Sequence, residues 1–375
     1  MFKMRRFSKL LSLICIMALL MVSISGCGGG SQQDADNGDA GSGGKETIKL
    51  VIGAGHPADT VQWTYGVTQF FQKNVEERVA AETDYEIQWT DAYGGTVAKL
   101  GEVLEAVESG LLDLGMIVYV FEPTKLMLEG MTYRMPFQSP DPIMVAEAAM
   151  ELYEEFPEFK ADFEKYNQKF LGLAVSDNYN LFTTFPMEDV TDLNNRKIAG
   201  AGANLEWIKN TGAVGVQSNL NEGYTSMQTG VYEGFINPTG AMYRMKIHEV
   251  SDNLLLADFG VQIVGGLTIN MNTWNSLPED VQQIMLEEGE NMTMLEAQYT
   301  QDLYESDLAA MEAEGVNLVQ LSQEAKEEWV AMIPNVPGEL ADELNSLGYP
   351  GTEIVQAYFD KLVERGFVMP RDWEL

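Results

Sequence analysis

Few side chains in this 375-residue sequence have the type and spacing that catalysis or metal binding requires. The chain has two histidines, His56 and His248, and two cysteines, Cys15 and Cys27. Zinc sites are built from clusters of cysteine and histidine, and neither histidine lies in such a cluster. The sequence contains no phosphate-binding loop, nucleophile elbow or dinucleotide fingerprint. We therefore expect no catalytic residues, no metal site and no cofactor, and we do not expect an enzyme.

Cys27 is the residue best placed for covalent chemistry. It ends the run Ile24-Ser25-Gly26-Cys27, behind an uncharged apolar stretch at 10–22 and a basic head. These features are typical of a secretory signal, and the apolar run is too short for a membrane span. The ending resembles the bacterial lipobox, in which the signal is cut before the cysteine and the thiol receives a diacylglycerol. The alternative is an ordinary signal followed by an unmodified cysteine.

The composition after Cys27 indicates a tether and then a large folded part. Residues 28–44 are rich in Gly, Ser, Gln and Asp, which is typical of a flexible linker. The sequence thus predicts a signal at 1–26 and a tether at 27–45. The net charge of −34 disfavours binding to nucleic acid and to anionic headgroups. A salty environment and a cationic partner are both compatible with this charge.

Strands and helices alternate along the folded part. The first series has strands at 48–53, 85–89 and 112–120, and helices at 59–82 and 99–109. The second has strands at 170–175, 180–185, 196–199, 234–237 and 261–271, and helices at 203–211 and 221–229. Such alternation predicts an α/β fold with parallel-rich sheets covered by helices. A further helix, 274–313, is long enough to lie along both halves of such a fold.

Four sequence blocks, in this order, resemble the extracytoplasmic solute-binding proteins of TRAP transporters, in the dicarboxylate-type group. They lie at 100–114, 192–198, 224–234 and 274–282. The last three read DLNNRKI, YTSMQTGVYEG and WNSLPEDVQ, where the family has patterns like DLKGxKI, YxALQTGVVDG and WxxLPxxVQ. The resemblance covers the chain from about 48 to 363.

The resemblance implies a two-lobed, periplasmic-binding-protein-like fold with a hinge and a ligand cleft between the lobes. We expect 46–175 to form mainly lobe 1, 176–270 mainly lobe 2, and 271–375 the C-terminal helices and a return to lobe 1. The resemblance also implies delivery of a small-molecule ligand to a small and a large TRAP membrane subunit, driven by a sodium or proton gradient. Together with the lipobox, it places the protein on the extracytoplasmic face of the cell membrane, held there by its lipid anchor.

The sequence departs from the family at the positions that usually bind a carboxylate. The family typically has arginine after the KI of DLKGxKI, where this chain has Ala199, and a second arginine position corresponds to Asn180. A guanidinium forks onto a carboxylate in a way that neutral residues cannot copy. Arg196 and Lys197 flank a short strand, so we expect them to be exposed. We therefore expect a polar ligand that is neutral or cationic rather than a simple carboxylate.

Candidate ligand-binding residues lie at predicted strand ends, where ligands of α/β sheets bind, and at the predicted crossing between lobes. They are His56, Trp63, Tyr93, Tyr119, Asn178, Tyr179, Asn180 and Asn237, with Phe121, Asn204, Trp207, Asn219 and Tyr224 as further candidates. Each also has a purely structural interpretation. Trp63 lies at helical spacing with Val67 and suits core packing, and His56 before Pro57 suits a helix cap.

A receptor that delivers its ligand for transport is the function that these features favour. One alternative is a ligand-sensing lipoprotein that presents its ligand to a signalling partner. The sequence does not separate sensing from transport, because both would use the same hinge. A secreted hydrolase is disfavoured, because no nucleophile, base or metal set is assembled. The C-terminal stretch 340–373 shows no clear heptad, so we expect a monomer.

Overall fold

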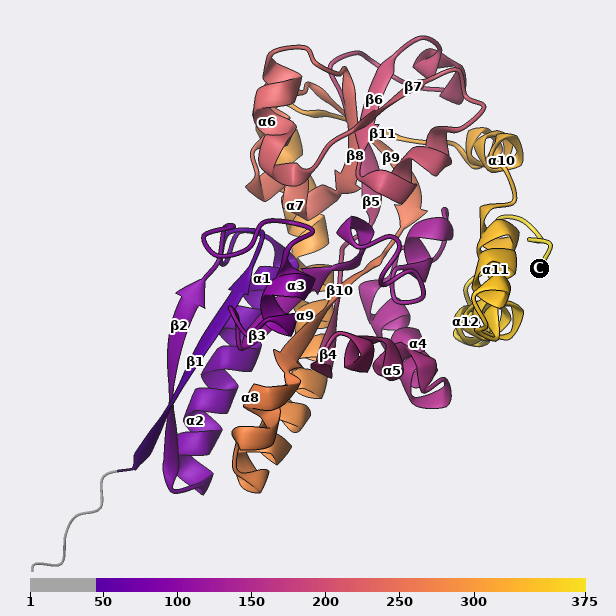
Figure 1. The fold of residues 1–375 in the computed structure, drawn as a ribbon. Coiled ribbons are helices and arrows are strands. Elements are labelled where there is room, and N and C mark those ends of the chain that lie inside the picture. The colour runs from indigo at the N-terminus through magenta and orange to yellow at the C-terminus, as the bar shows by residue number, and fades with distance from the viewer. Residues whose placement is uncertain (1–44) are drawn as a thin grey trace, which may run out of the picture. The chain divides into compact units, whose positions relative to one another are not determined.

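The computed structural model describes residues 45–375, which contain two mixed β-sheets (Figure 1). The predicted signal, Cys27 and the tether up to residue 44 lie outside the described residues. The first sheet has the order β2 (Tyr85–Ala92), β1 (Glu46–Ala54), β3 (Leu114–Val118), β10 (Ile263–Asn270), β4 (Gln168–Val175). The second has the order β11 (Asn317–Gln320), β9 (Asn253–Gly260), β5 (Tyr179–Thr183), β8 (Gly234–Pro238), β6 (Lys197–Gly200), β7 (Val214–Gln217).

Each sheet combines parallel pairs with one antiparallel strand in its middle. Strand β1 pairs in parallel with β2 and β3, and β6 pairs in parallel with β7 and β8. Strand β10 is antiparallel to both of its neighbours, and so is β5. Every residue of β3, β5, β8 and β10 is buried, which is why these segments are short apolar runs.

Helices cover both sheets. Those of the first part of the chain are α1 (Gln62–Tyr65), which continues through the π-helical segment Gly66–Gln72 into α2 (Lys73–Glu82), then α3 (Val103–Glu108), α4 (Pro142–Glu155) and α5 (Glu158–Lys165). Those of the later part are α6 (Leu220–Gln228), α7 (Thr239–Arg244), α8 (Met271–Ser276), α9 (Glu279–Ala313), α10 (Gln323–Met332), α11 (Val336–Ser346) and α12 (Gly351–Glu364). The helix predicted at 203–211 is a 3-10 helix, Gly202–Ile208. Helices α4 and α5 and strand β9 were not predicted.

Two short segments join the sheets. Strand β4 leads into β5 through 176–178, and β9 leads into β10 through 261–262. These crossings are bonded to each other, because the Ser176 amide donates to the Gln262 carbonyl and the Gln262 amide donates to Ser176 Oγ, both at 2.9 Å. Two strands that change sheets at one place form a natural hinge.

Two strands belong to a different sheet from the rest of the predicted range that contains them. Strand β10 falls within 176–270 but belongs to the first sheet, and β11 falls within 271–375 but belongs to the second. The chain therefore returns to the first sheet before the long helix and visits the second sheet again after it. Helices α11 and α12 then pack together, and α12 packs on α4.

Helix α9, of 35 residues, contacts both halves of the fold. It packs on β4, α2 and α4 beside the first sheet, and on α7 and β11 beside the second (Figure 1). The predicted helix from 274 is interrupted, because α8 ends at Ser276 and Pro278 precedes a new helix.

Two glycines allow α9 to lie directly on β4. A Cβ placed on Gly289 of α9 would be 2.3 Å from the Leu171 carbonyl oxygen, and one on Gly172 of β4 would be 2.1 Å from the Gly289 carbonyl oxygen. Real Cβ atoms do not approach backbone oxygens this closely. The helix and the strand are thus held at a distance that only glycine permits on either side.

Glu296 of α9 is buried beside the crossing and gives the fold an unusual pH dependence. Its carboxyl oxygens accept from the Val175 amide at 3.1 Å and from Thr300 Oγ1 at 3.0 Å. Burial raises the pKa of Glu296 from 4.5 to about 8. The folded protein therefore binds this proton more tightly than the unfolded chain, so its contribution to stability is complete below pH 4.5 and is lost as the pH rises towards 8.

Replacing Glu296 by glutamine should reduce the fall in melting temperature between pH 5 and pH 8, because glutamine stays neutral throughout. Part of the fall should remain, since burial also raises the pKa of Asp177 and of Glu122 to about 7. Thermal unfolding across this pH range measures the effect. Glu290→Gln, at an exposed position of the same helix, is the matched control. An unchanged pH profile in E296Q would show that Glu296 is not the group responsible.

Within residues 45–375, none of the helices combines the length and the apolar character that crossing a membrane requires.

Candidate ligand-binding site

A pocket opens between the two sheets, beyond the ends of several strands, and encloses about 290 Å³ of empty space, including space open to solvent. The elements of the first sheet and its loops contribute His56, Trp63, Val118, Val120, Phe121 and Val264. Those of the second sheet contribute Tyr179, Ala201, Asn219, Leu220 and Asn237, and Tyr133 completes the lining. The pocket is thus complete only when both sheets contribute to it, as expected for a site that closes around a ligand.

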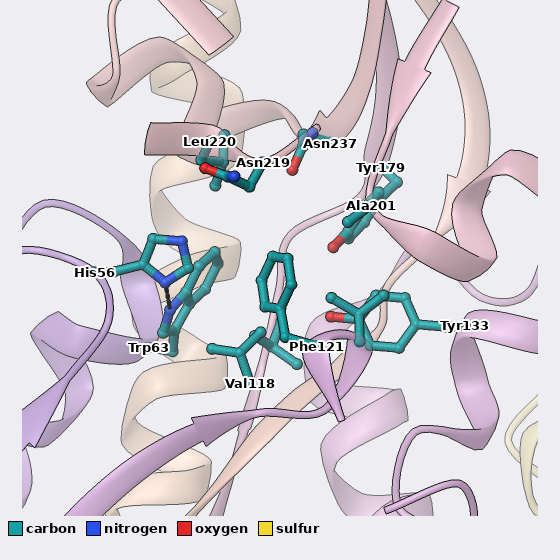
Figure 2. A pocket seen from close by; sticks show the side chains of 12 residues that line it. His56, Trp63, Val118, Phe121, Tyr133, Tyr179, Ala201, Asn219, Leu220 and Asn237 are labelled. Atoms are coloured by element: carbon teal, nitrogen blue, oxygen red, sulfur yellow. Dashed lines mark hydrogen bonds between the residues drawn. The ribbon is translucent and has the colours of Figure 1, made fainter. Parts of the chain in front are cut away.

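His56 and Trp63 form one flank of the pocket (Figure 2). The indole Nε1 of Trp63 donates to His56 Nδ1 at 3.2 Å, and the two rings meet edge to face at 5.2 Å. Because Nδ1 accepts, the proton of a neutral imidazole must be on Nε2. Burial lowers the pKa of His56 to about 4, so the ring is neutral under ordinary conditions and presents Nε2–H as a fixed donor.

Two carboxamides lie together on a second side of the pocket (Figure 2). Within residues 45–375, Asn219 Oδ1 and Asn237 Nδ2 are buried atoms without a hydrogen-bond partner. Asn219 occupies the N-cap position of α6, yet its side chain does not cap the helix. Buried polar groups are usually paired, so these two atoms indicate where a polar ligand would bind.

No residue of the pocket lining carries a charge near neutral pH. The lining contains no Asp, Glu, Lys or Arg. His56 is neutral, and burial raises the pKa of Tyr133 and of Tyr179, so both hydroxyls keep their protons. Ala199 is fully buried in β6 and Ala201, two residues further on, lines the pocket. At Ala199 a methyl group therefore replaces the guanidinium that the family resemblance implies.

The arginines of residues 45–375 are all engaged away from the pocket. Five are paired with carboxylates: Arg78 with Glu82, Glu287 and Glu288, Arg134 with Glu343, Arg196 with Glu233, Arg244 with Asp307, and Arg365 with Glu147 and Glu151. Arg371 donates to the carbonyls of Val330 and Ile333. Arg196 and Lys197 are partly or fully exposed, as the sequence predicted. None of these residues lines the pocket.

Four of the eight principal candidates line this pocket: His56, Trp63, Tyr179 and Asn237. Tyr93 lies apart from it and donates its hydroxyl to Gln72 Oε1 at 2.8 Å. Tyr119 is buried in the core, with its hydroxyl 3.3 Å from that of Tyr153. Both tyrosines therefore have structural partners that occupy their hydroxyl groups.

Asn178 and Asn180 hold the crossing between the sheets together rather than lining the pocket. Asn178 donates to Asp258 Oδ1 at 2.8 Å and accepts from the Gly260 amide at 3.0 Å. Asn180 donates to Thr239 Oγ1 at 2.9 Å and accepts from the Asp258 amide at 2.9 Å. Their carboxamides are paired within the protein, in contrast to those of Asn219 and Asn237.

The secondary candidates Phe121 and Asn219 also line the pocket. Trp207 instead donates to the Tyr133 carbonyl at 2.9 Å, and Tyr224 contacts Glu249. Four further lining residues were not predicted: Tyr133, Ala201, Leu220 and Val264. Tyr133 lies in the short 3-10 helix Met131–Arg134, which has no periodic pattern, and the other three are apolar residues of a kind found throughout the core.

The family described as bacterial extracellular solute-binding protein, family 7 (DctP) matches residues 54–343. The chain belongs to this family. Family 7 contains the solute receptors of TRAP transporters, which bind small organic molecules, work with TRAP membrane subunits and are not enzymes. The resemblance found in the sequence is thereby confirmed, and so is the two-lobed α/β fold.

Individual relatives are distant. A solute-binding protein of Sulfitobacter sp. (strain NAS-14.1) is 32% identical over 129 residues, which are 34% of this chain and 39% of that protein. The ectoine/5-hydroxyectoine-binding periplasmic protein UehA of Ruegeria pomeroyi is 25% identical over 64% of this chain and 71% of its own length. A TRAP solute-binding protein of Rhodoferax ferrireducens, solved with copurified benzoate, has a TM-score of 0.73 at 15% identity and covers 84% of this chain and 98% of that one.

Proposed function

We propose that this protein is an extracytoplasmic receptor that captures a small polar organic molecule by hinge closure and delivers it to TRAP membrane subunits. The observation that carries the proposal is the pocket built from both sheets, with residues such as His56 on one side and Asn237 on the other. A ligand held by both halves favours the closed state, because some of its contacts exist only there. The mutually bonded crossings at 176–178 and 261–262 are the proposed hinge.

We further propose that the ligand is not a simple carboxylate, because Ala199 replaces the family's arginine and the pocket lining contains no cation. A buried carboxylate without a cationic partner would lose several kcal/mol of free energy relative to water. The half of the pocket formed by the second sheet offers carboxamides and hydroxyls instead of guanidinium groups.

The membrane attachment is part of the same proposal. A diacylglycerol on Cys27 and the tether at 27–45 would hold a monomeric receptor near its small and large membrane subunits. Tethering raises the local concentration of the receptor at a partner fixed in the membrane. Acyl chains such as palmitate bind membranes because each buried methylene contributes about 0.8 kcal/mol. Mass spectrometry of the N-terminal peptide from membranes would detect the lipid, and an unmodified Cys27 would contradict the anchor.

The receptor function can be tested by closure and uptake together. A ligand found by thermal-shift screening of a metabolite library should reduce the radius of gyration in small-angle X-ray scattering. It should also be accumulated by vesicles that carry the TRAP membrane subunits only when the receptor is added. Binding without compaction would contradict hinge closure. Compaction without uptake would contradict delivery and favour a sensing role.

A further inference from the structure

The pocket between the sheets presents hydrogen-bond donors and acceptors, which restrict the ligand further than the absence of charge alone. One of its donors is fixed, because Trp63 Nε1 occupies His56 Nδ1 and leaves the proton on Nε2. The ligand must therefore offer an acceptor, such as a carbonyl or hydroxyl oxygen, to this flank of the pocket.

Asn219 and Asn237 add a second requirement. A carboxamide presents an N–H donor and a C=O acceptor next to each other on one planar group. Asn219 Oδ1 and Asn237 Nδ2, which belong to two separate carboxamides, lack partners within residues 45–375. A ligand that pairs with both must offer a donor to Asn219 and an acceptor to Asn237, and an amide group carries both.

The remaining walls suit a compact, flat ligand body. The rings of Trp63, Phe121, Tyr133 and Tyr179 line the pocket (Figure 2), together with Val118 and Leu220. Aromatic faces pack well against planar groups, and the empty space of about 290 Å³, which includes space open to solvent, is close to the size of small-molecule sites. The pocket thus combines apolar walls with two polar, uncharged sides, one at His56 and one at Asn219 and Asn237.

We propose that the pocket binds an uncharged molecule with an amide edge, namely a primary amide, a lactam or a ureide, on a compact apolar or aromatic body. This inference rests on the proposed receptor function of the same pocket. The amide oxygen accepts from His56 Nε2–H or Asn237 Nδ2, and the amide N–H donates to Asn219 Oδ1. A carboxylate would be buried without a cation, and an ammonium group would be buried without a carboxylate, because the lining contains neither.

Matched pairs of amide and acid test this inference on the wild-type protein. Calorimetric titration would compare benzamide with benzoate, nicotinamide with nicotinate, and pyroglutamide with pyroglutamate. Within each pair the shape is nearly constant and the charge changes by one. We expect at least one amide to bind, and to bind at least about a hundredfold more tightly than its acid, because the buried acid would have no counter-charge.

Each other outcome overturns the inference. An acid that binds as tightly as its amide would show that the pocket supplies a cation, and binding of a polyol such as erythritol but of no amide would show an uncharged ligand of another class. Binding of none of these compounds would exclude the amide class for this pocket. In all these cases the receptor function is judged separately, by the compaction and uptake that a screened ligand produces.

A positive charge added to the pocket provides a second, independent test, because it should reverse the preference for amide over acid. Ala201→Arg adds a guanidinium to the lining of the pocket, on the side of Tyr179 (Figure 2), and it should shift the preference from amide to acid within each pair. Circular dichroism and the melting temperature show whether this variant folds. If it folds and the preference is unchanged, charge does not decide selectivity and the inference is wrong. If it does not fold, the wild-type pairs still decide the question.

Discussion

Replacing Asn237 by leucine is expected to weaken binding of the most tightly bound of the three amides by about 10- to 100-fold, without lowering the melting temperature of the ligand-free protein. Loss of a buried hydrogen bond to a neutral ligand weakens binding by about 1–3 kcal/mol. The ligand-free protein loses nothing comparable, because Asn237 Nδ2 has no partner within the described residues. Removing a buried, unpaired donor should leave stability unchanged or raise it.

Titration calorimetry and thermal unfolding of the same samples measure the two effects. Asn275→Leu, at an exposed position of α8, controls for the change of residue type. Wild-type affinity in N237L would mean that Asn237 does not contact the ligand. A large fall in melting temperature would mean that this carboxamide serves the fold, as those of Asn178 and Asn180 do.

Replacing Gly289 by alanine is expected to destabilise the protein by about 3 kcal/mol, at the upper end of the usual range for overpacking. Helix propensity alone predicts the opposite sign, since alanine in a helix interior is about 1 kcal/mol more favourable than glycine. The structure reverses this sign because the new Cβ would lie 2.3 Å from the backbone oxygen of Leu171. Neither backbone can move away without separating α9 from β4.

Chemical denaturation should show this loss of free energy of unfolding directly. Thermal unfolding should show a fall in melting temperature of roughly 5 °C. Glu290→Ala, one residue further along α9 and exposed, should change stability by less than about 0.5 kcal/mol. A Gly289→Ala variant as stable as the wild type would show that α9 and β4 are not in backbone contact.

Much of the fold could be predicted from local patterns. The buried strands are short apolar runs in the sequence, and the helix predicted at 99–109 contains α3, after which Gly110 has a φ of 76°. Helices α4 and α5 were not predicted, although their buried residues recur at helical spacing, as Val145, Ala149 and Leu152 do in α4. Strand β9 was not predicted, although Leu254, Leu255 and Leu256 form a short apolar run within it.

The candidate site was predictable to the extent that strand ends determine it. His56, Trp63 and Asn237 follow or flank predicted strand ends and line the pocket. Asn178 and Asn180 lie in the predicted crossing, but the sequence could not show that Asp258, Gly260 and Thr239 would occupy their carboxamides. Whether an asparagine faces a ligand or its own backbone depends on partners that are distant in sequence, and no local pattern records them.

The uncharged lining of the pocket has a consequence for the energetics of uptake. If the cargo carries no charge, the membrane potential acts only on the coupling ions, and the current per transport cycle equals the charge of those ions. A carboxylate cargo would instead carry one negative charge inward, against an inside-negative potential. That charge would oppose uptake by about 2.3 kcal/mol for every 100 mV. With a neutral cargo bound at Asn219 and Asn237, no part of the membrane potential opposes uptake, and all of its action on the coupling ions drives accumulation.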